Sequence, residues 1–298
     1  MLTQHQLSIM AAEHGFSAAS CCAPLPEDGA PQEVRALLLL ARFYIPGGRL
    51  VDAFYPASNA AYHEAKALTE EISGRFGVKA LQLPQVRLKP LCARLPAFAR
   101  GMNTLSSLPG QGSRFCLELL GISEPVEIDE ELPAQAALPC AACRRCRDAC
   151  PTGAITETGF VRERCIRHHM LSGKPMPEEM RPYIGTKTAA IVGCDLCQRA
   201  CPANAQIEAQ RQEEDRFTLD ELLVCDDETM REFARLYGSN YAIRNRVLAQ
   251  AALAAGNTGE EKYRPALERL ADSASPTVAE HARWALRKLD EMGQMKQK

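Results

Sequence analysis

The feature that most constrains this 298-residue chain is a run of four cysteines between residues 140 and 151. It reads Cys-Ala-Ala-Cys-Arg-Arg-Cys-Arg-Asp-Ala-Cys-Pro, so three thiols follow a C-x2-C-x2-C spacing and the fourth precedes a proline. Three thiolates at these intervals can wrap one cube of iron and sulfide, whereas the fourth turns away and serves a second cube. The spacing therefore predicts an iron-sulfur site.

A second run, Cys194-Asp-Leu-Cys197-Gln-Arg-Ala-Cys201-Pro202, repeats the last three cysteines of the first run with the same terminal proline. Its first ligand would fall at Ile191, which cannot bind iron, and Cys165 is the only cysteine between the runs. Eight thiolates are what two 4Fe-4S clusters need. We assign Cys140, Cys143, Cys146 and Cys201 to one cluster, and Cys194, Cys197, Cys165 and Cys150 to the other.

Two other interpretations of the cysteines remain, a structural zinc site and a disulfide framework. Zinc takes four ligands and leaves four cysteines unexplained. A disulfide framework does not fit a sequence without a secretory signal, whose cysteines fall in ligand spacing. The five cysteines outside the runs are interpreted as small buried hydrophobes in a reducing compartment; they are Cys21, Cys22, Cys92, Cys116 and Cys225.

Length and composition predict a soluble globular protein. The chain is long enough for about two domains. It is 46% hydrophobic and 24% charged, with a formal net charge of -2. No apolar run approaches the ~18 residues of a membrane span. We expect a cytoplasmic monomer without a membrane partner.

The N-terminal part alternates helical and strand patterns. Helical spacing over 2–14 ends at a glycine, and 34–43 is nearly all apolar, as in a central strand covered on both faces. A helix follows over 58–74, and 77–83 alternates like another strand. This order predicts a small α/β domain within residues 1–130.

Two segments connect this domain to the cysteine runs and beyond them. The acidic stretch 124–131, with flanking prolines, is interpreted as a linker into a cluster domain over 131–215. Polar residues 206–216 are interpreted as a solvated helix or connector.

Residues 109–113 form a glycine-rich turn, where glycine permits a close ligand approach, although a plain surface turn is the favoured interpretation.

The C-terminal part, 216–298, has the pattern of packed helices. Pro265 and Pro276 are placed as first-turn prolines, and two segments resemble each other at an offset of about 35 residues, as in helical repeats. A buried stripe is predicted at Val278, Ala282, Ala285 and Leu289.

Basic residues suggest two further features. From residue 231 onwards there are 12 Lys and Arg against 8 Asp and Glu. Nucleic-acid contact and solvated helix faces both explain this surplus; the arginines concerned are Arg244, Arg246, Arg264, Arg283 and Arg287. Other arginines crowd the cluster ligands and should favour the reduced clusters; they are Arg144, Arg145, Arg147, Arg164, Arg167 and Arg199. His168 and His169 could bind a metal or shuttle protons, but a surface pair is the simpler interpretation.

Together, the first cysteine run with its Pro-Thr-Gly-Ala-Ile continuation, Arg164-Cys165-Ile166, 177–182, 193–198 and the helical tail resemble epoxyqueuosine reductases. That family uses a corrinoid, cobalamin, and two 4Fe-4S clusters to remove the epoxide oxygen from a modified base in a tRNA anticodon loop. The resemblance implies an α+β fold with an N-terminal α/β domain, a ferredoxin-like cluster domain and HEAT-like helices. It also implies a flavodoxin- or ferredoxin-like electron donor, and tRNA bound by the C-terminal helices.

A weaker similarity covers residues 101–105 and 109–113, and it implies cofactor-binding roles for Asn103, Gly110, Gly112 and Ser113. The resemblance aligns a family segment that carries an aspartate, its proposed proton donor, with Arg87-Leu88-Lys89-Pro90 of this chain. No catalytic residue is therefore assigned. Loss of a positioned acid lowers a rate by ~10²–10⁴-fold. The alternative function is a non-catalytic, ferredoxin-like electron carrier.

Overall fold

The structure is a computed structural model that describes residues 2–129, 132–134 and 136–296. The chain divides into two compact units, each assembled from separate stretches of sequence. The predicted three-domain division stays a prediction, and its first boundary, at residues 130 and 131, lies outside the described residues. The first unit comprises Met1–Ile45, Pro56–Cys143 and Pro202–Ala209; the second comprises Pro46–Tyr55, Arg144–Cys201 and Gln210–Lys298.

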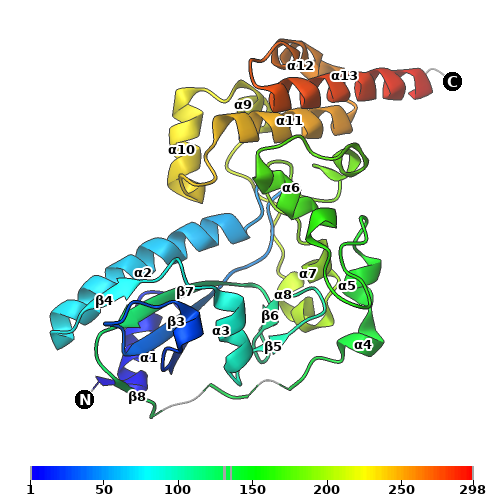
Figure 1. Cartoon of the computed structure of the whole chain (residues 1–298). Coiled ribbons are helices and arrows are strands. Elements are labelled where there is room, and N and C mark those ends of the chain that lie inside the picture. The colour runs from blue at the N-terminus through cyan, green and yellow to red at the C-terminus, as the bar shows by residue number, and fades with distance from the viewer. Residues whose placement is uncertain (1, 130–131, 135, 297–298) are drawn as a thin grey trace. The chain divides into compact units, whose positions relative to one another are not determined.

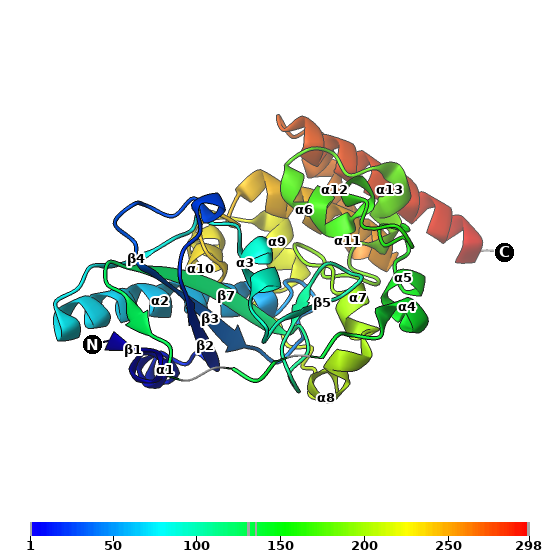
Figure 2. The same ribbon diagram turned by 60° about the horizontal axis from the view of Figure 1, so that its bottom comes forward.

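A four-stranded sheet organises the first unit (Figure 2). Its order is β2-β3-β7-β4, and each neighbouring pair is antiparallel. The predicted central strand is confirmed, because β3 pairs with β2 on one side and β7 on the other. The bounds are β2 (Ala18–Cys22), β3 (Ala36–Phe43), β4 (Ala80–Gln82) and β7 (Phe115–Ile122).

Sequence reasoning did not assign two of these strands, β2 and β7. The predicted strands β3 and β4 are not neighbours, because β7 lies between them and pairs with both. Consecutive strands joined by a helix usually lie side by side, and this split arrangement departs from that rule. The four-stranded sheet therefore has no parallel pair, although the mixture of helices and strands is as predicted.

Helices cover the sheet of the first unit. Figure 1 shows α2 (Phe54–Phe76) running along it. Helix α3 (Leu88–Arg94) packs elsewhere on the sheet, where its Leu91 shares a core with Leu37 and Leu39 of β3. Successive strand residues point to opposite faces, so both faces of β3 are buried. The predicted apolar stripe of α2 is fully buried at Ala61, Ala65, Leu68 and Ile72.

A histidine fixes helix α1 (Gln4–Glu13) to α2. His14 Nδ1 lies 3.2 Å from Glu64 Oε2, and His14 Nε2 lies 2.9 Å from Glu71 Oε2. Burial by itself would lower the pKa of His14, but the hydrogen bonds and charges of Glu71 and Glu64 outweigh it, and the pKa is raised above 6.5.

This pair of contacts should make the first unit more stable at acidic than at alkaline pH. A raised histidine pKa contributes stability that is fully present below the unfolded value of 6.5 and lost as pH rises through the folded value. We expect the stability advantage of the wild type over His14→Gln to shrink across that interval, as measured by urea unfolding. An advantage that does not change with pH would contradict this role for His14.

Short ladders complete the first unit. The predicted linker 124–131 contributes a strand, because β8 (Val126–Glu127) pairs in parallel with β1 (Leu2–Thr3). Asp129 accepts a hydrogen bond from the backbone of His5 at 2.9 Å. The described part of this stretch is therefore attached to the N-terminus, whereas Glu130 and Glu131 lie outside the described residues. A further two-stranded ladder joins β5 (Ala99–Arg100) to β6 (Ser106–Ser107).

The second unit ends in the predicted helical region. Pro265 lies in the first turn of its helix and Pro276 begins another, and all four predicted stripe residues are buried. Figure 1 shows the last helices packed alongside one another. The bounds are α9 (Leu219–Val224), α10 (Asp227–Tyr237), α11 (Arg244–Thr258), α12 (Arg264–Ala271) and α13 (Pro276–Lys296).

Two contacts hold α11 against α13. Gly256 lies so close to Ala285 that an added Cβ would fall 2.6 Å from the Ala285 Cα. The buried ring of His281 accepts a hydrogen bond from the Met176 backbone N–H at 2.9 Å, and its Nδ1 lies 2.9 Å from the carbonyl oxygen of Ala249. Since Nε2 is the acceptor, Nδ1 carries the proton and donates it to Ala249.

Three simpler predictions can be compared with the structure. No helix in the described ranges is both long and apolar enough for a membrane span. Four of the five cysteines outside the runs are buried and Cys22 is partly buried. The segment 206–216, predicted as a helix or a connector, begins in the short helix α8 (Ala205–Glu208). Residues 209–216 contain no helix and form a connector, in which Asp215 accepts hydrogen bonds from the backbone of Arg49 and Leu50.

Candidate iron-sulfur centre

The two cysteine runs fold into the same local structure. In the first run, α5 (Arg145–Asp148) carries Cys146; in the second, α7 (Leu196–Arg199) carries Cys197, and the two helices lie side by side. Each run ends in a Cys-Pro step, and proline stops a helix because it lacks a backbone N–H. The sequence repeat is therefore also a repeat of a short helix that presents a thiol.

Five thiols gather in the second unit. Burial raises the pKa of Cys197 to about 12, helped by the neighbouring thiols of Cys165, Cys146 and Cys150. Burial likewise raises the pKa of Cys194, whose neighbours include Cys197 and Cys165. Cys165 thus lies near the second run, and its role as a cluster ligand stays a prediction.

Within the described residues, no three His, Cys, Asp or Glu side chains meet closely enough to hold one metal ion. A 4Fe-4S cluster places four iron ions between its thiolates, so its ligands stand further apart. Cys140 and Cys143 form α4 (Cys140–Cys143) in the first unit, and their assignment to a cluster with Cys146 and Cys201 stays a prediction.

Hydrogen-bond donors surround the sulfur atoms. The backbone N–H of Ala154 donates to Cys150 Sγ at 3.4 Å, whereas the Thr152 hydroxyl, 3.5 Å from the same sulfur, donates to the Arg164 carbonyl. The backbone N–H of Leu196 donates to Cys194. Donors to the sulfur stabilise its negative charge and so favour the reduced cluster.

The arginines near the ligands carry less free charge than the sequence suggested. Arg199 binds Asp195 at 2.8 Å, and Arg147 binds Glu157 at 2.7 Å. Arg167 is buried, stacks over the ring of Phe54 and donates to the Tyr55 hydroxyl. Because two of these guanidinium groups are paired with carboxylates, the expected effect of positive charge on the clusters is reduced.

The two adjacent histidines hold the local backbone and side chains. Arg162 Nε donates to His168 Nδ1 at 3.2 Å. His169 Nε2 lies 2.7 Å from the carbonyl oxygen of Glu163. These contacts fit the simpler of the two interpretations, a structural surface pair.

The glycine-rich turn contacts the segment that follows the second cysteine run. The backbone N–H of Ser113 donates to Asn204 Oδ1 at 2.7 Å, and a Cβ on Gly112 would lie 2.0 Å from that oxygen. The side chain of Arg114 is fully buried and pairs with Glu208. Gly112 and Ser113 therefore fix the backbone after Cys201.

The other two residues proposed to bind a cofactor are Asn103, which holds a local turn, and Gly110, which borders open space. Asn103 is buried, and its Oδ1 accepts from the Leu105 backbone at 3.2 Å. Gly110 has a positive φ of 68° and open space beside it. Within Arg87–Pro90, Lys89 Nζ donates to Thr104 Oγ1 at 3.0 Å. No structural observation assigns these residues to a ligand.

Sequence reasoning missed one acid with unusual properties. Burial raises the pKa of Glu118, on β7, to about 7, while a hydrogen bond from Gln82 acts in the opposite sense. A single glutamate within an apolar strand gave no sequence signal. Carboxyl groups that stay protonated near neutral pH occur at catalytic sites, but also wherever a sheet buries an acid.

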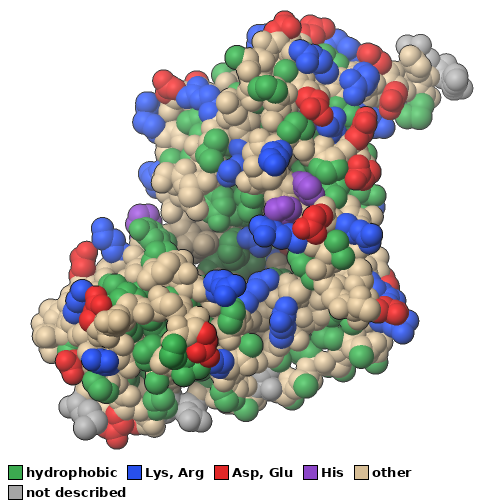
Figure 3. All heavy atoms as spheres, viewed as in Figure 1, with side chains coloured by type: hydrophobic (Ala, Val, Ile, Leu, Met, Phe, Trp, Pro, Cys, Tyr) green, Lys and Arg blue, Asp and Glu red, His purple; other side chains and the backbone are tan. Residues whose placement is uncertain are grey.

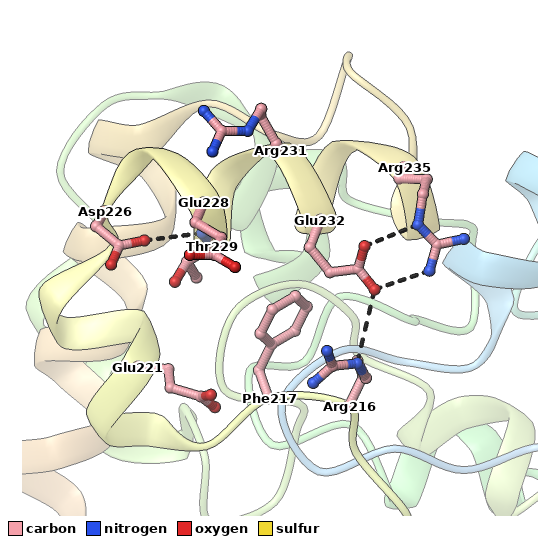
Figure 4. A pocket seen from close by; sticks show the side chains of 9 residues that line it. All are labelled: Arg216, Phe217, Glu221, Asp226, Glu228, Thr229, Arg231, Glu232 and Arg235. Atoms are coloured by element: carbon pink, nitrogen blue, oxygen red, sulfur yellow. Dashed lines mark hydrogen bonds and ion pairs between the residues drawn. The ribbon is translucent and has the colours of Figure 1, made fainter.

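A cavity of about 690 Å³ lies beside α10 in the second unit (Figure 4). Glu232 lies between two arginines in it, 2.7 Å from Arg235 and 3.6 Å from Arg216. Glu221 accepts from the backbone N–H of Thr218, the residue that caps α9, and Asp226 caps α10. Its charged groups thus largely satisfy one another.

The tail arginines are also engaged. Arg264 pairs with Glu261 and Asp290, both within 2.8 Å. Arg244 pairs with Asp227, and Arg283 donates to the Ala271 carbonyl. Figure 3 shows basic and acidic side chains interspersed over the C-terminal helices on the face in view. The four excess positive charges of this segment therefore do not form a continuous basic surface on the face in view.

Comparison with known proteins resolves the nature of the cysteine runs. Residues 139–204 match the family model of a 4Fe-4S double cluster binding domain. This segment contains all eight proposed ligands, so iron-sulfur clusters are confirmed over zinc. An epoxyqueuosine reductase of Lactococcus garvieae is 31% identical over 180 residues, 57% of this chain and 50% of the relative. An epoxyqueuosine reductase of Xanthomonas campestris is 36% identical over 201 residues, which are 62% of this chain and 53% of the relative.

The chain is a relative of the epoxyqueuosine reductases. It spans about half the length of these relatives in the matched regions. The fold agrees over more of the chain. The epoxyqueuosine reductase of Streptococcus thermophilus matches 98% of this chain and 91% of its own, with a TM-score of 0.78 and 19% identity. A solved epoxyqueuosine reductase with an epoxyqueuosine-modified tRNA-Tyr stem loop matches 96% of this chain and 89% of its own, with a TM-score of 0.74 and 18% identity.

Proposed function

We propose that this protein is an iron-sulfur reductase that acts on epoxyqueuosine in tRNA. Electrons from a flavodoxin- or ferredoxin-like donor would enter one 4Fe-4S cluster and pass to the second. The observation that carries the proposal is the placement of Cys165 beside Cys194 and Cys197, within a double cluster domain whose relatives are epoxyqueuosine reductases.

The chain's own residues fit two clusters. The second cluster would be held by Cys194, Cys197, Cys165 and Cys150, and each cluster supplies one-electron transfer when bound. The buried thiols of Cys194 and Cys197 limit the access of water to their ligand bonds, and the donors at Cys150 and Cys194 tune the potential. Asp195 and Arg199 form an ion pair beside Cys194, which reduces the net charge next to this ligand.

A corrinoid is part of this proposal through the family resemblance. Four residues of the chain are proposed to contact the corrinoid. Gly110 faces open space, whereas Gly112, Ser113 and Asn103 make contacts inside the first unit. These contacts do not direct a polar group at a ligand, and we assign no step of the mechanism to the corrinoid. Retention of cobalamin by protein purified without oxygen would test its presence directly.

The test of the function is to supply the gene to cells that lack epoxyqueuosine reductase and to weigh the nucleosides of their tRNA. We expect conversion to queuosine at a rate ~10²–10⁴-fold below that of an enzyme with a positioned acid, because Arg87–Pro90 contains none. A Cys194→Ala variant should show no conversion. Full-speed conversion would show that another group delivers the proton.

The second candidate function is an electron carrier without catalysis. The missing acid favours it, since the cluster domain would remain useful without an active site. This function predicts intact clusters and electron transfer, but neither conversion of epoxyqueuosine nor binding of tRNA or cobalamin.

A further inference from the structure

A small polar cavity lies where three elements of the second unit meet. Its volume is about 160 Å³, below the ~300 Å³ of a site for a whole cofactor. Its walls come from the end of α6 (Ile166–Ser172), the start of α11 and the N-terminus of α13. The lining residues used below are Lys174, Asn245, Arg246, Gln250, Ser275 and Thr277.

Two of the residues that line the cavity each carry a buried polar atom with no hydrogen-bond partner among the described residues. Gln250 is 2% exposed, and its buried Oε1 has no hydrogen-bond partner among the described residues. The buried Nε of Arg246 also lacks one, although its Nη1 donates to the Asn240 carbonyl at 3.4 Å. Buried polar groups are nearly always paired, so an unpaired acceptor beside an unpaired donor indicates a missing partner that offers both.

The charge around these atoms is positive. Lys174 and Arg246 line the cavity, and among its described lining residues none is acidic. Helix α13, 21 residues long, begins at Pro276, which has no N–H, and the Ala279 N–H donates to the Ser275 carbonyl at 3.0 Å. Thr277 and Val278 therefore supply the N–H groups of its first turn at this end. Helix N-termini bind anions, phosphate above all, through these groups and the helix dipole.

We propose that this cavity binds a phosphate group together with an adjacent hydroxyl. The phosphate oxygens would accept from Lys174, Arg246 Nε and the first turn of α13. The hydroxyl would donate to Gln250 Oε1, which a fully ionised phosphate cannot do. Two sources offer this chemistry, the ribose-phosphate backbone of RNA and free hydrogen phosphate. The RNA source rests on the proposed function; the phosphate chemistry does not.

The walls of the cavity are held in place independently of any ligand. Thr277 Oγ1 donates to the Gly173 carbonyl at 3.3 Å, and His281 joins the Met176 backbone to α11. A preformed site loses little freedom on binding. Lys174 can thus be replaced on an exposed surface, and Gln250 by a residue of similar length, without removing these contacts.

The experiment uses anaerobically reconstituted protein carrying its clusters. Binding of an RNA stem-loop, the DNA stem-loop of the same sequence, and inorganic phosphate is measured for the wild type and two variants. Lys174→Gln should weaken binding of the RNA by about tenfold and lower its salt dependence by about one unit of log-log slope. The matched control, Lys262→Gln, replaces an exposed lysine outside the cavity and should bind like the wild type.

The variant Gln250→Met distinguishes a ligand-binding role of Gln250 from a structural role. It removes an unpaired buried acceptor, so the folded protein should be no less stable. It should nonetheless lower the preference for RNA over DNA, because the 2′-hydroxyl loses its acceptor. A purely structural glutamine would leave this preference unchanged.

Each outcome decides between the sources. Weaker RNA binding in both variants but not in the control supports the RNA source. Weaker binding of inorganic phosphate with unchanged RNA binding supports free phosphate. Unchanged binding of both overturns the proposal. Failure of the wild type to convert epoxyqueuosine, with phosphate binding still dependent on Lys174, would refute the proposed function and leave this site standing.

Discussion

Cys165→Ala should remove one of the two clusters and leave about half of the iron, roughly four atoms per chain instead of eight. The physical reason is the position of Cys165. It lies outside both runs, yet its thiol neighbours the buried sulfurs of Cys197 and Cys194. A cubane that loses a thiolate either dissociates or gives up one iron, so a three-iron species is the other form of the same result.

The measurement is iron and sulfide content after anaerobic reconstitution, together with the electron paramagnetic resonance of the reduced protein. Cys22→Ser is the matched control, because Cys22 is a partly buried cysteine outside the cluster domain. Full iron content and unchanged spectra in Cys165→Ala would show that another residue completes the second cluster.

Acidification should weaken the second unit through His281. Burial lowers the pKa of this ring from 6.5 to about 4. A histidine with a depressed folded pKa stabilises the protein above its unfolded value, and the contribution is lost as pH falls from 6.5 through 4, since the unfolded chain binds the proton more readily. With these two values, about 2 kcal/mol is lost by pH 5.

His281→Gln tests this without removing the contacts. A glutamine can accept from the Met176 N–H and donate to the Ala249 carbonyl, but it does not titrate. The difference in stability between wild type and variant should therefore change between pH 7.5 and pH 5 in favour of the variant. Parallel curves over this range would mean that the ring is not held neutral by its surroundings. Comparing the two proteins at each pH cancels the acid sensitivity of the clusters, which both share.

The local features of this protein follow from its sequence. Ligand chemistry restricts cluster sites to cysteines at fixed intervals, so the spacing of the two runs, together with the isolated Cys165, is enough to predict two clusters. The same holds for the buried stripes of α2 and α13, because helical period alone decides which residues share a face. The prolines at the starts of α12 and α13 likewise act through their own geometry.

Only the tertiary structure decided features that depend on residues far apart in the chain. Strand β7 enters between β3 and β4 because pairing partners are chosen by the whole sheet, and no local pattern records that choice. The tail arginines looked available for RNA in a charge count, yet Arg264 is paired with Asp290, 26 positions away. Gln250 and Lys174 are 76 positions apart and meet in one cavity, because the fold, and not the sequence spacing, brings their elements together.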